Sequence, residues 1–285
     1  MEAEEEQKQG KPVFVIDDEI ENDSAPAKTS KPEKKQRKPQ FVKEVNKSKI
    51  SSAISSGDAY AAFEASNPLS LLEFRDFEGR VKKLVYNSSD ITIKQLQYVL
   101  GKDFDDFVDL TDKDSQISKI LSSPPFEPKV AESEDDWMKS TIDVDRLLLF
   151  GLLYCKGDKK VKCLAFYDIL QDALQEDISA GDKDITFAIV WLYELSTHWV
   201  HTWALENAKA QGFEDKINQE KLCERFADKS SLKENLEELH EDFLDDSFGD
   251  MSRISRLEFL KTIEKSCLYL FDPEEQRKKV LEKVS

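Results

Sequence analysis

The sequence predicts an all-α protein, built of helix-loop-helix units that follow a disordered N-terminal tail. The chain of 285 residues has nine prolines and nine glycines, and no proline occurs between Pro128 and Pro273. A proline inside a helix costs about 3 kcal/mol and a glycine about 1 kcal/mol, so this stretch favours helices. Apolar residues also recur at every third or fourth position in the longest segments, which is the period of one helix face.

Charge is distributed unevenly along the chain. Residues 1–50 hold 11 basic and 11 acidic side chains; subtracting these from the 41 and 58 of the whole chain leaves 30 basic and 47 acidic residues in 51–285. The helical body therefore carries the whole net charge of −17. A body this acidic repels a phosphate backbone, which argues against nucleic acid as its partner. With no run of about 18 apolar residues, we expect no membrane span.

Composition divides the chain into segments. Residues 1–50 are rich in Glu, Lys, Pro and Ser and bury too few apolar side chains to offset the entropy of ordering, which predicts disorder. Prolines and acids gather again after residue 123. We therefore predict a tail at 1–50, a small helical unit at 51–123, a linker at 124–139 and a larger helical domain at 140–285.

An apolar tetrad followed by acids lies inside the tail, at Val13, Phe14, Val15, Ile16, Asp17 and Asp18. It resembles a SUMO-interacting motif, which implies that the segment adds a strand to the exposed sheet edge of a SUMO-like partner while the acids meet a basic rim. The alternatives are a chance apolar cluster and a segment that docks on its own domain.

A basic run that contains Lys34, Lys35, Arg37 and Lys38 follows the tetrad, and it resembles a nuclear-localisation signal. A solvated run that balances the nearby acids is the alternative. Four of the first six residues are glutamates, whereas a secretory signal peptide begins with basic and then apolar residues. We expect a nuclear or cytoplasmic protein.

The four cysteines of the chain lack CxxC spacing and are expected to be buried thiols.

The strongest helical pattern runs from Lys183 to Gln211. Trp191, Trp199 and Trp203 share one apolar stripe of this helix. Core packing is the ordinary role of such a stripe. Tryptophan is also enriched among the residues that anchor protein partners, so these three are candidate partner-binding residues.

A second amphipathic helix is predicted at 232–243. Ser230 or Ser231 is the expected N-cap, and Glu234 would complete a capping box.

Two stretches, 147–170 and 236–263, each place a polar loop between apolar helices, with a lone β-branched residue, Val161 or Ile254, after the loop. This pattern resembles the EF-hand family. The resemblance implies that each β-branched residue occupies the eighth loop position and pairs with a neighbouring loop as a small sheet. Ile91 occupies the same place in a fainter copy.

Glu258, Asp112 and Asp114 are the candidate metal ligands that the resemblance implies. Calcium needs six to eight oxygens, mainly from loop positions one, three, five, seven and twelve. Counting back from Ile254 places Gly249 and Met251 at two of these positions. We therefore expect no bound metal or other cofactor, and a calmodulin-like packing scaffold with inert loops.

His198 and His201 lie one helical turn apart, as ligands of a metal would. The chain has no GxGxxG, no Walker loop and no GxSxG elbow. The sequence thus predicts a non-catalytic adaptor or regulatory subunit that binds protein partners through a tryptophan-rich helical face and the tail. An EF-hand calcium sensor, and a helical metalloprotein or enzyme that uses the two histidines, are the alternatives.

Overall fold

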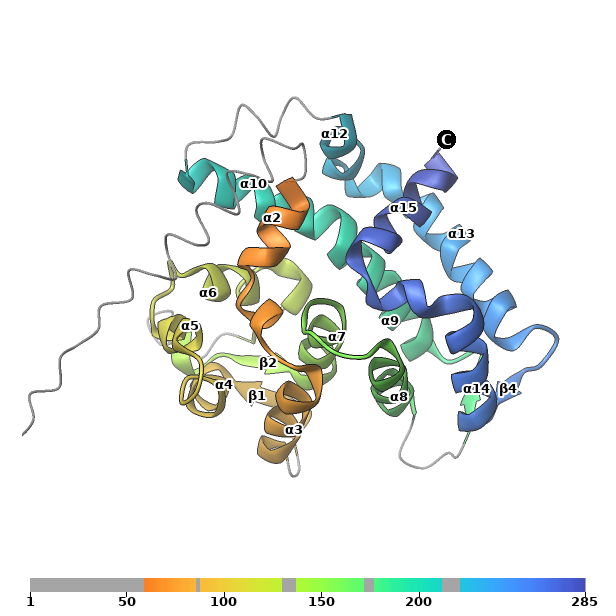
Figure 1. The fold of residues 1–285 in the computed structure, drawn as a ribbon, viewed down its shortest axis with the longest axis horizontal. Helices are drawn as coiled ribbons and strands as arrows, with labels where there is room; N and C mark the ends of the chain where they lie inside the picture. Colours follow the sequence, from red (N-terminus) through yellow and green to blue (C-terminus); the bar gives the residue numbers. More distant parts are fainter. Residues whose placement is uncertain (1–58, 86–87, 130–136, 172–176, 212–220, 285) are drawn as a thin grey trace, which may run out of the picture. The chain divides into compact units, whose positions relative to one another are not determined.

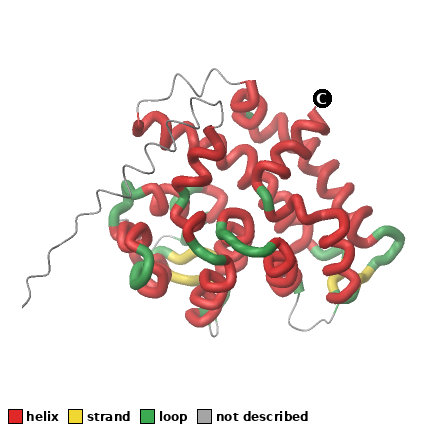
Figure 2. The backbone as a smooth tube through the Cα atoms, viewed as in Figure 1, coloured by secondary structure: helices red, strands yellow, loops and turns green. Residues whose placement is uncertain are grey.

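The computed structural model describes residues 59–85, 88–129, 137–171, 177–211 and 221–284, and most of them are helical, which confirms the predicted all-α class (Figures 1 and 2). The α-helices are α2 (Ala59–Ser66), α3 (Phe74–Leu84), α4 (Ile93–Leu100), α5 (Asp105–Val108), α6 (Gln116–Leu121), α7 (Val144–Tyr154), α8 (Lys159–Leu170), α9 (Lys183–Glu194), α10 (Val200–Gln211), α12 (Lys221–Ala227), α13 (Lys229–Phe248), α14 (Arg256–Thr262) and α15 (Pro273–Val284). The 3-10 helices are η1 (Pro68–Leu71), η2 (Asp109–Thr111), η3 (Pro124–Phe126), η4 (Trp137–Lys139) and η7 (Leu268–Phe271), and two π turns are η5 (Leu195–Trp199) and η6 (Ile263–Cys267). None of the described helices is both long enough and apolar enough to cross a bilayer.

Four short strands form two antiparallel ribbons. β1 (Asp90–Thr92) pairs with β2 (Thr141–Asp143), and β3 (Ile178–Ser179) pairs with β4 (Arg253–Ile254). An isoleucine stands opposite an isoleucine in each ribbon, and all four side chains are buried. Every strand lies just before a helix, namely α4, α7, α9 or α14. The ribbons thus connect parts of the chain that lie far apart in sequence.

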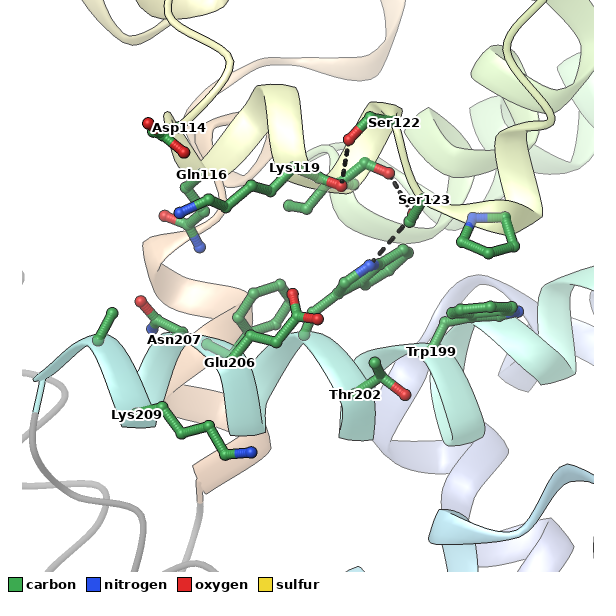
Figure 3. Close-up of a pocket in the computed structure, with 15 residues that line it drawn as sticks. Asp114, Gln116, Lys119, Ser122, Ser123, Trp199, Thr202, Glu206, Asn207 and Lys209 are labelled. Carbon is green, nitrogen blue, oxygen red and sulfur yellow. Dashed lines mark hydrogen bonds between the residues drawn. The ribbon is translucent and has the colours of Figure 1, made fainter.

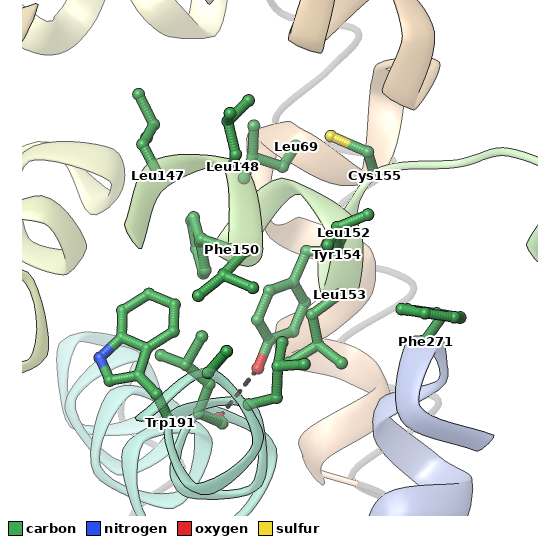
Figure 4. Close-up of a cluster of buried hydrophobic side chains, with 14 of the residues drawn as sticks. Leu69, Leu147, Leu148, Phe150, Leu152, Leu153, Tyr154, Cys155, Trp191 and Phe271 are labelled. Atoms are coloured by element: carbon green, nitrogen blue, oxygen red, sulfur yellow. Dashed lines mark hydrogen bonds between the residues drawn. The ribbon is translucent and has the colours of Figure 1, made fainter. Parts of the chain in front are cut away.

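Helix α7 is the centre of the core (Figure 4). From Leu147 to Tyr154 every one of its residues is buried, as expected of a helix that is apolar on all sides. Gly151 lets α3 approach closely, because a Cβ atom there would lie 2.4 Å from Cε1 of Phe77. Tyr154 reaches the next layer, where its hydroxyl donates to the carbonyl of Leu195 at 3.0 Å.

The helix predicted from Lys183 to Gln211 is confirmed as the continuous run α9, η5 and α10. The π turn η5 changes the backbone hydrogen bonding of this long helix, because in a π turn the carbonyl of residue i pairs with the amide of residue i+5. Side chains from elsewhere supply donors to two of its carbonyls: Tyr154 to Leu195, and Nη1 of Arg277 to Ser196 at 3.2 Å.

Both ends of the described chain meet at this turn. Helix α2 packs on α10, and α15 packs on η5. The guanidinium of Arg277 in α15 binds both carboxylate oxygens of Glu64 in α2, and it lies 5.1 Å from the ring centroid of Tyr60. Next to it, Oγ of Ser196 donates to Gln276 at 2.6 Å. A largely buried polar network therefore ties α2, η5 and α15 together.

The described parts of 51–123 and 140–285 share one hydrophobic core rather than forming two units, since β1 pairs with β2 and Phe63 stacks on Trp203. The segment 124–139, expected to be a linker, takes part in this core where it is described. The ring of Phe126 makes edge contacts with two core aromatics, and Nε1 of Trp137 donates to the carbonyl of Leu110 at 3.0 Å. These two aromatic side chains anchor the described parts of a segment whose prolines and acids suggest an exposed connection.

Two local predictions are wrong. Val161 lies inside α8 and not in a strand, because Asp158 accepts the amide of Lys160 and starts the helix there. Helix α13 begins at Lys229, capped by Asp228, whose Oδ1 accepts the amide of Ser230 at 2.9 Å. The predicted serine caps are therefore already inside the helix.

Candidate functional site

The three tryptophans of the predicted stripe differ in exposure. Trp191 and Trp203 are buried, and their indole nitrogens donate to the carbonyl of Pro125 and to Oγ of Ser123. Trp199 is partly exposed. Of the three tryptophans predicted to bind a partner, only Trp199 is thus partly exposed at the surface of the described chain.

Trp199 lies in a groove of about 630 Å³ between α10 on one side and α6 with η3 on the other (Figure 3). Apolar side chains line its inner part: Phe63, Ile120, Pro124, Trp199 and Trp203. Charged and polar residues line its rim, among them Asp114, Lys119 and Glu206. This combination of an apolar floor and a polar rim is typical of a site that accepts a partner's apolar side chain.

The ring of Trp199 packs against the hydrophobic core and contacts two neighbouring aromatic rings. Its centroid lies 5.0 Å from that of His198 and 6.3 Å from that of Trp203. Its Nε1 is enclosed but has no hydrogen-bond acceptor in the described structure, whereas the indole nitrogens of the other three tryptophans are hydrogen-bonded. A buried donor without an acceptor is unfavourable, so a small movement of this ring toward an acceptor on a bound partner would be stabilising.

The wall opposite Trp199 was not predicted from the sequence. Lys119 and Ile120 come from α6, and Ser123 follows it, at the end of the predicted helical unit and just before the segment predicted to be a linker. The one available signal was Pro124-Pro125, which ends the helix and turns the chain across α10.

Glu258, a candidate metal ligand, is engaged in capping α14. Its Oε2 accepts the amide of Ser255 at 3.2 Å and the hydroxyl of Ser255 at 2.6 Å, while Oγ of Ser255 accepts the amide of Glu258. These hydrogen bonds lower the pKa of Glu258, the side-chain bond most strongly. The carboxylate is thus used locally as part of a capping box.

Asp112 and Asp114, the other candidate ligands, lie in the turn before α6. Oδ1 of Asp112 accepts the amide of Asp114 at 2.9 Å, which closes an Asx turn. Asp114 contributes to the rim of the groove. Among the described residues, no three His, Cys, Asp or Glu side chains gather in a way that could hold a metal ion.

The two histidines on the long helix contact different partners. Nδ1 of His201 lies 3.1 Å from the hydroxyl of Tyr60, and Nδ1 of His198 lies 3.1 Å from the carbonyl of Phe226. Burial, and to a smaller degree the charge of His198, lowers the pKa of His201. The histidines therefore take part in the packing of α2 and α12 against α10.

The motif residues of the tail, Val13 to Asp18 and Lys34 to Lys38, lie outside the described residues. Comparison of the chain with protein-family models, with curated proteins and with solved structures found no match. The groove around Trp199 is therefore assessed on its chemistry alone.

Proposed function

We propose that this chain is a non-catalytic protein-binding adaptor whose groove around Trp199 receives an amphipathic helix of a protein partner. The observation that carries the proposal is a partly exposed tryptophan, free of indole hydrogen bonds within the described structure, at an apolar groove with a charged rim. Aromatic residues that fill such grooves commonly supply most of the binding free energy. The partner's apolar side chains would enter between Trp199 and Ile120, and its polar face would meet the rim.

We further propose that the body is an EF-hand-like scaffold of four helix-loop-strand-helix units. The support is the pairing of Ile91 with Ile142 and of Ile178 with Ile254, each just before a helix. In the EF-hand family the aliphatic residue of one loop pairs with that of the next in this way.

In two of the four loops the twelfth position, counted from these isoleucines, is engaged in the capping of its own helix. Gln95 accepts the amide and the hydroxyl of Thr92, as Glu258 does for Ser255. In another loop the twelfth position is Arg146, a cation. This favours a scaffold whose loops serve packing rather than calcium binding.

Replacing Trp199 by Ala should weaken the binding of a partner helix at least thirtyfold, since an anchoring aromatic contributes 2 kcal/mol or more. The probe is the tightest binder selected from a displayed library of amphipathic helical peptides on the wild-type chain, measured by fluorescence anisotropy. The matched control is Phe187→Ala, which removes an exposed aromatic outside the groove. The indole N–H resonance of Trp199 should shift most among the four on titration. Binders that tolerate Trp199→Ala would rule out the groove.

The tail is proposed to add a second, weaker contact by strand addition to a SUMO-like partner, and linked weak contacts raise avidity. Replacing Val13, Val15 and Ile16 together by Ala should reduce SUMO binding at least tenfold, measured by calorimetry on the full chain. The control replaces Ala25 and Ala27 of the tail by Ser. An unchanged affinity of the triple variant would remove this part of the proposal.

A further inference from the structure

A second groove, of about 500 Å³, lies between α3 and α4 on the described body. It lies outside the groove around Trp199 and shares no lining residue with it. Its lining residues are Arg75, Asp76, Gly79, Arg80, Lys83, Tyr98, Val99 and Lys102.

The charge of this groove is opposite to that of the body around it. Four cations and a single carboxylate line it, although residues 51–285 hold 47 acids against 30 bases. Arg80 is already engaged, because its guanidinium pairs with Asp103 and donates to the carbonyl of Val99. Arg75 and Lys83 form no ion pair with any described residue and are exposed. Two cations are therefore available to an anionic ligand.

Gly79 opens the middle of the groove. It lies at the centre of one α3 stripe, four residues after Arg75 and four before Lys83. A Cβ atom at this position would have no heavy atom within 4 Å, so packing does not require a glycine. A glycine inside a helix costs about 1 kcal/mol relative to alanine. Its effect here is to leave bare backbone between two free cations, which permits close approach of another main chain.

Tyr98 forms the aromatic wall of the groove. Tyr98 is 62% exposed, the second highest value among the large hydrophobic residues described. Nζ of Lys102 lies 4.0 Å from its ring centroid, which places a third cation next to the ring. An apolar side chain of a ligand can pack on the ring while neighbouring carboxylates reach Arg75 and Lys83.

We propose that this groove binds a short acidic segment of a protein partner, with carboxylates on Arg75 and Lys83 and its main chain over Gly79. A groove of this volume holds only a few residues, which fits a linear segment. A nucleic acid or an anionic membrane extends well beyond it and would meet the acidic remainder of the body. The charge of that remainder acts over about 8 Å at physiological ionic strength and so affects a short segment much less. The inference is independent of the groove around Trp199.

The test measures binding of a fluorescein-labelled hexapeptide, five Glu or Asp residues with one Leu, to the full chain at 0.15 M salt. We expect saturable binding to the wild-type chain. The double substitution Arg75→Glu with Lys83→Glu should weaken this binding at least tenfold. Gly79→Glu should weaken it by a similar factor while keeping the melting temperature, because the new side chain meets open space and improves helix propensity. Lys265→Glu, an exposed cation in η6, is the matched control and should change the affinity less than twofold.

Three results would overturn the proposal. The first is that the wild-type chain binds a neutral peptide, with Gln and Asn in place of the acids, as tightly as the acidic one. The same conclusion follows if the Arg75→Glu, Lys83→Glu variant binds the acidic peptide as tightly as the wild-type chain does. The second is tighter binding of an oligonucleotide or of phosphatidylserine vesicles that the same substitutions abolish. The third is a tenfold gain in peptide affinity when Asp17, Asp18 and Glu19 become amides, because the chain's own tail would then be the occupant.

Discussion

Replacing Arg277 by Met should lower the free energy of unfolding by about 3–5 kcal/mol, as expected when one partner of a buried ion pair is removed. The Arg277 side chain is 8% exposed and that of Glu64 is 18% exposed. The substitution leaves the Glu64 carboxylate without its bidentate partner and takes a donor from the carbonyl of Ser196 in the π turn. Urea unfolding of the full chain, followed by circular dichroism, measures the change.

A double-mutant cycle separates the ion pair from general loss of packing. Glu64→Gln keeps the shape of the side chain, and the double variant should lose about 1–3 kcal/mol less than the two single variants together. Lys278→Met is the matched control, since Lys278 is the next residue of α15 and, among the described residues, its ion pairs are with Glu274 and Glu275 on the exposed face. A loss below 1 kcal/mol for Arg277→Met would show that the network does not hold α15 in place.

The helices were predictable because their signals are local. The absence of proline from 129 to 272 and the periodic apolar stripes account for the long helix through Trp191 and Trp203 and for α13. The resemblance to the EF-hand family implies that Ile91 and Ile254 lie in short strands, and they lie in β1 and β4.

The strand partners were not predictable, because pairing joins residues that are distant in sequence. Ile178 pairs with Ile254 across 76 positions, and nothing near Ile178 distinguishes it from other lone isoleucines. The sequence instead favoured Val161, which follows a Gly-Asp turn. Asp158 of that turn caps a helix, and a cap and a loop ligand use the same residue type.

Only part of the candidate site could be predicted from the sequence, for a related reason. Helical periodicity places the tryptophans on one stripe, but it does not say which of them the rest of the chain covers. Phe126 packs against Trp191 and Phe63 against Trp203, and both come from segments remote from α10. Trp199 is left as the partly exposed member of the stripe only after these contacts form.

Replacing Lys162 by Met should raise the free energy of unfolding at pH 7 by about 2–3 kcal/mol. Lys162 lies in α8 with only 4% of its surface exposed, and its ammonium forms no ion pair with a described residue. Burial lowers its pKa from 10.5 to about 8, although Cys155 and the carboxylates of Asp272 and Glu73 act in the opposite direction. This lowering corresponds to about 3 kcal/mol of unfavourable interaction for the charged form. Methionine keeps the packing of the stem and removes the charge.

The pH dependence gives this prediction its sharpest test. The folded state releases the Lys162 proton near pH 8 and the unfolded state near pH 10.5. Between these pH values the unfolded state therefore binds more protons than the folded state. The free energy of unfolding of the wild type thus rises with pH relative to that of Lys162→Met. The difference in the free energy of unfolding between the two proteins should have its full value at pH 7 and should be mostly lost by pH 10. Lys160→Met is the control, because Lys160 is exposed and pairs with Glu264 at 3.2 Å, so its removal should change little at either pH. A destabilising effect of Lys162→Met at pH 7 would mean that Glu73 and Asp272 stabilise the ammonium by more than its burial costs.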